Sequence, residues 1–105
     1  MLDINTISKR YFDISISVED DDGRTYSAKL EVEPPKVKAL RKIVELSKDK
    51  NDENALSEAI RIILSKNKTG YRVPDEIIDN LDIDQYRTIL EEYGKWIAET
   101  KNSPN

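Results

Sequence analysis

The strongest constraint in this sequence is a strict alternation of apolar and polar side chains on both sides of an acidic turn. Successive side chains of a β-strand point to opposite faces, so this alternation predicts two half-buried strands. The run Asp20-Asp21-Asp22-Gly23 between them favours a tight hairpin turn, because an Asp-Gly pair tolerates positive φ angles. We therefore predict a β-hairpin over residues 10–32, whose apolar face contains Phe12, Ile14, Ile16, Val18, Tyr26, Ala28, Leu30 and Val32.

The residues after the hairpin follow a helical period. An isolated two-stranded hairpin is marginally stable in water, so its apolar face needs a cover. Apolar residues recur at helical spacing in four stretches after Pro34-Pro35. The first stretch places one stripe of apolar side chains at Val37, Leu40, Ile43 and Val44. The sequence thus predicts a single α+β domain over residues 1–105, in which an N-terminal β-hairpin packs on a small bundle of three to four helices. Along the chain we expect an irregular lead-in (1–9), the hairpin (10–32), a helical part (35–99) and a frayed tail (100–105).

Two helix starts and one weak point are visible within the helical part. Asp52 is a suitable N-cap for the second helix. Asp82, with Gln85 three residues later, resembles a capping box at the start of the last helix. Gly94 lies inside that last helix, where glycine costs roughly 1 kcal/mol relative to alanine. We expect Gly94 to permit a close packing contact.

The composition excludes most catalytic and metal sites. The chain has no histidine and no cysteine, so it lacks the usual general base near neutral pH, a thiol nucleophile and the commonest zinc ligands. The acidic turn does not match a calcium loop: with Gly23 at the sixth position, Val18 and Lys29 occupy the first and twelfth, where carboxylates are needed. No glycine-rich phosphate loop is present. We predict a protein that is not an enzyme and that uses no metal or cofactor.

The features that bear on location favour the cytoplasm. The N-terminus lacks the apolar stretch of a signal peptide. The longest uninterrupted apolar run is Ile62-Ile63-Leu64, far too short to span a membrane. Without cysteine, nothing in the chain indicates an oxidising compartment. We therefore expect a cytoplasmic protein that makes no membrane contact.

Charge is unevenly distributed along the chain, whose net charge is −4. Residues 36–50 carry six basic and two acidic side chains, whereas residues 75–92 carry seven acidic and one basic. The plainest interpretation is two solvated helix faces. The alternative is head-to-tail self-association, in which the basic surface of one copy meets the acidic surface of the next and builds a homo-oligomer. The charges that this alternative uses are Lys38, Arg41, Lys42, Asp75, Glu76 and Asp79.

The basic stripe also raises the question of nucleic acid. Net negative charge argues against phosphate binding, and neither a helix-turn-helix pattern nor an aromatic stacking platform accompanies the stripe. We predict no nucleic-acid partner. A nucleic-acid-binding regulator remains the third hypothesis, and salt-sensitive DNA binding that is lost on replacing Lys38, Arg41 and Lys42 would favour it.

Large side chains near the carboxyl end are candidates for contact with another protein. Tyrosine and tryptophan are favoured anchors at protein interfaces. Ile62 lies off the main apolar stripe of its helix. The alternative is that these side chains complete a small core, in which case only an exposed fraction would mark a partner site. The candidate partner-binding residues are Ile62, Tyr86, Tyr93 and Trp96.

The order of these features is familiar across nearly the whole chain. A leading hairpin with an Asp-Gly turn is followed by Pro-Pro and by three characteristic segments: Val37-Lys38-Ala39-Leu40, Ala55-Leu56-Ser57-Glu58-Ala59-Ile60, and Asn80-Leu81-Asp82-Ile83-Asp84-Gln85-Tyr86 with Ile89-Leu90, Tyr93 and Trp96-Ile97. This layout resembles the tail assembly chaperones of long-tailed phages, particularly those of prophages in Gram-positive bacteria.

The resemblance implies a function, partners and a location, the cytoplasm of a bacterial host. Such chaperones coat the long, apolar tape measure protein during tail morphogenesis and are then displaced by tail tube subunits. Membership would imply many weak apolar contacts with the tape measure protein, strengthened by self-association. The alternative is a small non-enzymatic adaptor or inhibitor module that binds another bacterial or phage protein.

Overall fold

The fold begins with the hairpin that the alternation predicts. The computed structural model describes residues 3–4 and 10–99, so most of the predicted lead-in and the whole predicted tail (100–105) lie outside the described residues. β1 (Phe12–Glu19) and β2 (Thr25–Val32) pair antiparallel, with Phe12 opposite Val32 and Glu19 opposite Thr25. Directly opposite residues point to the same face, so this register gathers the apolar side chains of both strands on one side. The hairpin prediction is confirmed.

The turn of the hairpin is one residue longer than a two-residue Asp-Gly turn. The Asp20 N–H donates to the Arg24 carbonyl at 2.9 Å, and the Gly23 N–H donates to the Asp20 carbonyl at 3.0 Å. The loop therefore consists of residues 21–23, and Gly23 ends it with a φ of 84°. The Asp20 carboxylate accepts from the amides of Asp22 and Arg24, both at 2.9 Å. This is the common three-residue hairpin loop, whose last residue must adopt the left-handed conformation.

The helices follow, and two of them are capped by side chains as predicted. The Asp52 carboxylate accepts from the Ala55 N–H at 3.1 Å. Asp82 and Gln85 form a full capping box, each side chain accepting from the other residue's amide at 2.8 Å. These caps satisfy N–H groups that a helix start leaves without an intrahelical partner. The helices are α1 (Val37–Leu46), α2 (Glu53–Ser65), α3 (Asp75–Asp79) and α4 (Ile83–Ala98).

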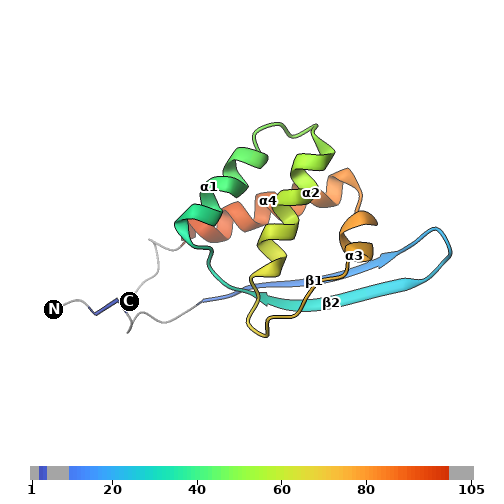
Figure 1. The fold of residues 1–105 in the computed structure, drawn as a ribbon, viewed down its shortest axis with the longest axis horizontal. Helices are drawn as coiled ribbons and strands as arrows, with labels where there is room; N and C mark the ends of the chain where they lie inside the picture. The colour runs from blue at the N-terminus through green and yellow to red at the C-terminus, as the bar shows by residue number, and fades with distance from the viewer. Residues whose placement is uncertain (1–2, 5–9, 100–105) are drawn as a thin grey trace.

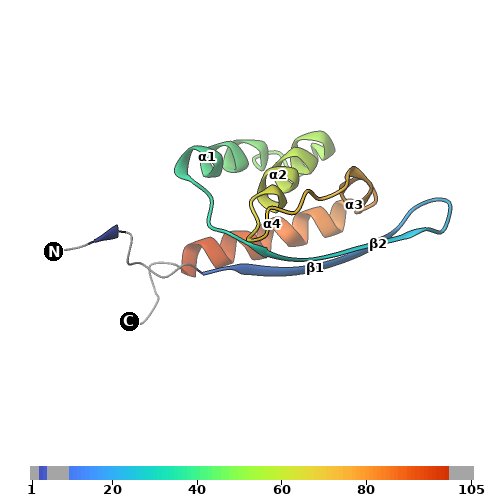
Figure 2. The same cartoon turned by 60° about the horizontal axis from the view of Figure 1, so that its bottom comes forward.

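The helices lie on one side of the hairpin, which makes this an α+β fold (Figures 1 and 2). The helix α2 is the central element, because it packs against α1, α3, α4 and β2. Its side chains at Leu56, Ile60, Ile63 and Leu64 are almost completely buried. The apolar face of the hairpin joins the same core. The predicted arrangement, a hairpin packed on a small set of helices, is confirmed.

The chain after α2 returns to the outer edge of β2. The Glu33 N–H donates to the Lys66 carbonyl at 2.8 Å, and the Lys68 N–H donates to the Glu31 carbonyl at 2.9 Å. Asn67, between the two lysines, is buried. These bonds satisfy backbone groups on the carboxyl half of β2 that a two-stranded sheet would leave open. One edge of the hairpin is therefore partly closed by its own chain.

Two packing expectations are wrong. Val37 and Val44, placed on the buried stripe of the first helix, are 64% and 55% exposed, whereas Ile43 is buried. The reason is that α1 lies at the margin of the fold and packs mainly against α2, so only part of its apolar stripe finds a partner. Gly94 does not support a close contact, because a Cβ built there meets nothing within 4 Å.

Candidate functional site

Metal-ligating clusters and shifted pKa values are two features that can mark a reactive site. No group of three or more aspartate and glutamate side chains among the described residues is placed to hold a metal ion. Burial raises the pKa of Tyr93 to about 12. The pKa of Lys95 is raised by its hydrogen bond to Glu92 and by the charges of Glu92 and Glu91. The first of these groups is a buried core phenol, and the second belongs to an exposed cluster of ion pairs.

The three aromatic side chains named as candidate partner contacts lie in the core, which is the alternative given for them in the sequence analysis. Tyr86, Tyr93 and Trp96 are 7%, 3% and 9% exposed. They belong to α4, which packs against α2, and the rings of Tyr93 and Trp96 also contact Phe12 at the start of β1. The Tyr86 hydroxyl donates to the Ile78 carbonyl at 2.8 Å. Their role is to complete the core.

An aromatic cluster joins the carboxyl end of α4 to the start of β1. The Phe12 ring meets Tyr93 edge-on with a centroid distance of 5.6 Å and lies 5.7 Å from Trp96. The Arg10 guanidinium carbon lies 4.3 Å from the Trp96 ring centroid, within the range of a cation–π interaction. Arg10 also donates to the Ile97 carbonyl at 3.4 Å. These contacts fix the position of β1 relative to α4.

The fourth candidate, Ile62, meets the predicted basic residues in one surface depression. This depression, of about 660 Å³, lies between α1 and α2. Its apolar floor is formed by Ala39 and Ile62, and Ile62 is only partly buried. No carboxylate is among its lining residues. We call it the basic groove, and its lining is Lys36, Lys38, Ala39, Arg41, Lys42 and Ile62.

The predicted acidic residues lie on the opposite side of α2. Glu76 and Asp79 are exposed on α3, and both views place α1 and α3 on either side of α2 (Figures 1 and 2). Asp75 differs from them because its carboxylate pairs with Arg61 of α2. We call Glu76 and Asp79 the α3 acidic surface. The structure therefore places the basic groove and the α3 acidic surface on different sides of the molecule, which the sequence alone did not require.

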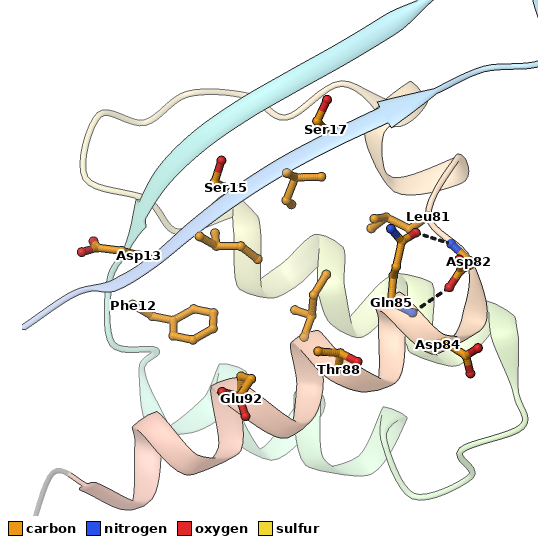
Figure 3. Close-up of a pocket in the computed structure, with 13 residues that line it drawn as sticks. Phe12, Asp13, Ser15, Ser17, Leu81, Asp82, Asp84, Gln85, Thr88 and Glu92 are labelled. Atoms are coloured by element: carbon orange, nitrogen blue, oxygen red, sulfur yellow. Dashed lines mark hydrogen bonds between the residues drawn. The ribbon is translucent and has the colours of Figure 1, made fainter. Parts of the chain in front are cut away.

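A second groove, which the sequence analysis missed, separates β1 from α4 (Figure 3). It has a volume of about 590 Å³ and an apolar floor. A one-dimensional apolar pattern assigns Ile14 and Ile89 to a core, but it does not reveal that their elements remain apart. We call this the hairpin groove, and its lining is Phe12, Asp13, Ile14, Ser15, Ile16, Ser17, Leu81, Asp82, Asp84, Gln85, Thr88, Ile89 and Glu92.

Comparisons with known proteins add no relative to this picture. No protein-family profile matches the chain, no curated protein matches it, and no solved structure matches its fold. Within residues 3–4 and 10–99, no helix is both long and apolar enough to cross a membrane. The two grooves and the separated charges are thus the features from which a function has to be argued.

Proposed function

We propose that this chain is a phage tail assembly chaperone, a non-enzymatic protein that self-associates and binds the tape measure protein during tail morphogenesis. The observation that carries the proposal is that the basic groove combines an apolar floor with four cationic side chains in its lining. Apolar floors bind apolar segments of other proteins, while charges around them orient the partner. The resemblance of the sequence layout to tail assembly chaperones supplies the identity of the client.

Self-association is proposed to use the two oppositely charged surfaces on either side of α2. The basic groove presents Lys36, Lys38, Arg41 and Lys42 on one side, and the α3 acidic surface presents Glu76 and Asp79 on the other. Surfaces on opposite sides of a molecule form a heterologous contact, which repeats from copy to copy and builds a chain or ring. Linking many copies raises the effective concentration of weak client-binding grooves.

Light scattering across a concentration series, at low and high salt, tests the self-association. We expect a mass that rises with concentration and falls with salt, because exposed charges are screened beyond about 8 Å at physiological ionic strength. A monomer at every concentration and salt would remove self-association from the proposal. It would leave the adaptor or inhibitor module as the better account of the basic groove.

A charge-swap experiment makes this test specific to the two surfaces. The triple variant Lys38→Glu, Arg41→Glu and Lys42→Glu leaves one cation and three carboxylates in the basic groove, so this copy has two acidic surfaces. The double variant Glu76→Lys and Asp79→Lys leaves a copy with two basic surfaces. Each variant alone is expected to be monomeric, whereas an equimolar mixture is expected to assemble. The control is Lys29→Glu, a charge reversal on the exposed face of β2 outside both surfaces. Assembly that survives in either variant alone would contradict the head-to-tail contact.

Client binding has its own test. Ile62→Asp places a carboxylate on the floor of the basic groove, and it is expected to abolish the solubilisation of a co-expressed tape measure protein. Ser65→Asp, on an exposed position of the same helix, is the control for the added charge. The genes that flank this one give a further check, because tail tube and tape measure genes on either side would support the assignment. Flanking genes unrelated to phage tails would contradict it.

A further inference from the structure

The two edges of the hairpin differ. The outer edge of β2 is covered at its carboxyl half by the backbone of Lys66 and Lys68. In the described part of the chain, β1 pairs with β2 and with no third strand. The hydrogen bond from the Asp20 N–H to the Arg24 carbonyl fixes the phase of the ladder. Even-numbered residues of β1 therefore bond to β2, and the odd-numbered residues direct their N–H and C=O groups away from it.

The free edge of β1 opens onto the hairpin groove. In Figure 3, β1 lies between β2 and α4, and residues of both β1 and α4 line the groove. The aromatic contacts of Phe12 close one end, and Leu81 lies at the junction of α3 and α4. The β1 residues 12–17 in the lining extend about 17 Å at 3.4 Å per residue, enough for a partner strand of about six residues.

The floor and the charge of this groove define what it accepts. Ile14, Ile16 and Ile89 provide apolar surface. Four of the thirteen lining residues are carboxylates and none is lysine or arginine, so the lining has a formal charge of −4. Asp84 and Glu92 have exposed ion-pair partners, Arg87 at 3.6 Å and Lys95 at 3.0 Å, but such pairs are weak and exchange readily. The other two carboxylates are Asp13 and Asp82.

We propose that the hairpin groove binds an extended segment of another protein, apolar at alternate positions and basic in its charged residues, as a third strand beside β1. The strand edge supplies backbone hydrogen bonds, the floor takes the inward side chains, and the negative lining selects basic residues. This inference goes beyond the chaperone assignment and does not depend on it, because it rests on the edge, the floor and the charge alone.

Charge disfavours a second copy of this chain as the occupant. Antiparallel pairing of β1 with β1 would set Asp13, Ser15, Ser17 and Glu19 of one copy against the same residues of the other. Like charges on facing strands are destabilising, and both grooves would bring their carboxylates to the shared edge. The acidic edge thus disfavours pairing with itself and favours a basic partner.

Synthetic peptides test the site without an identified partner. The probe is a capped, fluorescently labelled eight-residue peptide in which valine alternates with lysine, titrated with the full chain and followed by anisotropy. The control probe alternates valine with glutamate. We expect the lysine peptide to bind at least about tenfold more tightly, with the difference shrinking at high salt. Equal affinity of the two peptides, or no binding of either, would overturn the proposal.

Backbone methylation distinguishes strand addition from non-specific charge attraction. In an antiparallel arrangement, the peptide residues directly opposite Asp13, Ser15 and Ser17 point their N–H groups at β1. Opposite side chains share a face, so these peptide residues are the lysines when the valines face the floor of the groove. Methylating the lysine nitrogens should weaken binding about tenfold or more, and methylating the valine nitrogens should not. The reverse preference would indicate a parallel strand. Equal affinities for both methylated peptides would refute strand addition.

Variants of the protein locate the contact on β1. Ser15→Pro removes an outward N–H that β2 does not use, and proline is tolerated on a free strand edge. We expect about tenfold weaker peptide binding, while Ser15→Ala, which keeps the N–H, binds normally. Asp13→Asn should weaken binding about two- to threefold, and the matched Asp79→Asn on α3 should not. An unchanged affinity in both Ser15→Pro and Asp13→Asn, with circular dichroism showing a native fold, would place the peptide elsewhere.

Discussion

Replacing Asn67 with alanine is expected to cost this domain a large part of its stability. Asn67 is 5% exposed, and its side chain makes three short hydrogen bonds. The Nδ2 group donates to the Leu64 carbonyl at 2.9 Å and to the Tyr71 carbonyl at 2.8 Å, while Oδ1 accepts from the Tyr71 N–H at 2.8 Å. This side chain therefore joins the end of α2 to the loop after it, the segment whose backbone bonds to the edge of β2.

The magnitude follows from what each partner loses. A hydrogen bond contributes about 1 kcal/mol net, and a buried group left without a partner costs about 1–3 kcal/mol. Leu64 is fully buried, so its carbonyl gains no water in exchange, whereas Tyr71 is 44% exposed and its backbone groups recover part of their hydration. We expect Asn67→Ala to lower the free energy of unfolding by about 2–3 kcal/mol. For a domain of this size, that corresponds to a fall in Tm of about 10–20 °C.

Urea and thermal unfolding followed by circular dichroism at 222 nm measure this change. The matched control is Thr69→Val, which removes only the 3.3 Å bond from Thr69 to the Asn67 Oδ1 and should change stability by less than about 0.5 kcal/mol. Hydrogen exchange at the Glu33 and Lys68 amides should accelerate in Asn67→Ala, because both bond across the edge that Asn67 holds. If the free energy of unfolding of Asn67→Ala lies within about 0.5 kcal/mol of the parent's, this structural role of the Asn67 side chain is refuted.

Three further predictions follow from the helical half. Since burial raises the pKa of Tyr93 to about 12 from 10.0, the folded chain keeps its phenolic proton between pH 10 and 12 while the unfolded chain loses it. Stability should therefore fall across that window by up to about 2–3 kcal/mol relative to Tyr93→Phe, as measured by urea unfolding against pH, and parallel curves would contradict it. Asp82→Ala should cost about 1 kcal/mol by removing the capping box, and Asp82→Asn should recover most of that loss in the same assay. Gly94→Ala should raise stability by about 0.5–1 kcal/mol, because the added Cβ meets nothing within 4 Å; a lower Tm would show a contact there.

Local signals in the sequence predicted most of the fold. The period-two alternation located both strands, since it is set by the geometry of each strand alone. The caps at Asp52 and Asp82 were visible for the same reason, because each involves a side chain and an amide three residues away. The buried hydrogen bonds of Asn67 were not predicted. Its amide is buried because the chain returns to the edge of β2 after α2, and no local pattern in the sequence indicates that return.

The candidate site was harder to predict because exposure depends on how elements pack. Tyr86, Tyr93 and Trp96 have the character of interface anchors, but the domain buries them in its own core. Val37 and Val44 show the opposite error: they sit on an apolar stripe, yet α1 finds a partner only along part of it. Residue type and periodicity indicate that a side chain has an apolar environment. They do not indicate whether that environment is the core or another molecule.

The hairpin groove shows why a strand edge can carry more information than a strand face. The apolar side chains of β1 pack into the core, and the alternation alone determines which side chains these are. The outward residues Asp13, Ser15, Ser17 and Glu19 are free of that requirement, and they are acidic or small. Two acidic positions suffice to oppose β1–β1 pairing, and the small serines between them leave the backbone accessible. An edge protected only against aggregation would gain from lysine or proline as well. One that carries carboxylates alone repels its own copy while it attracts a basic strand, so protection and selectivity arise from the same residues.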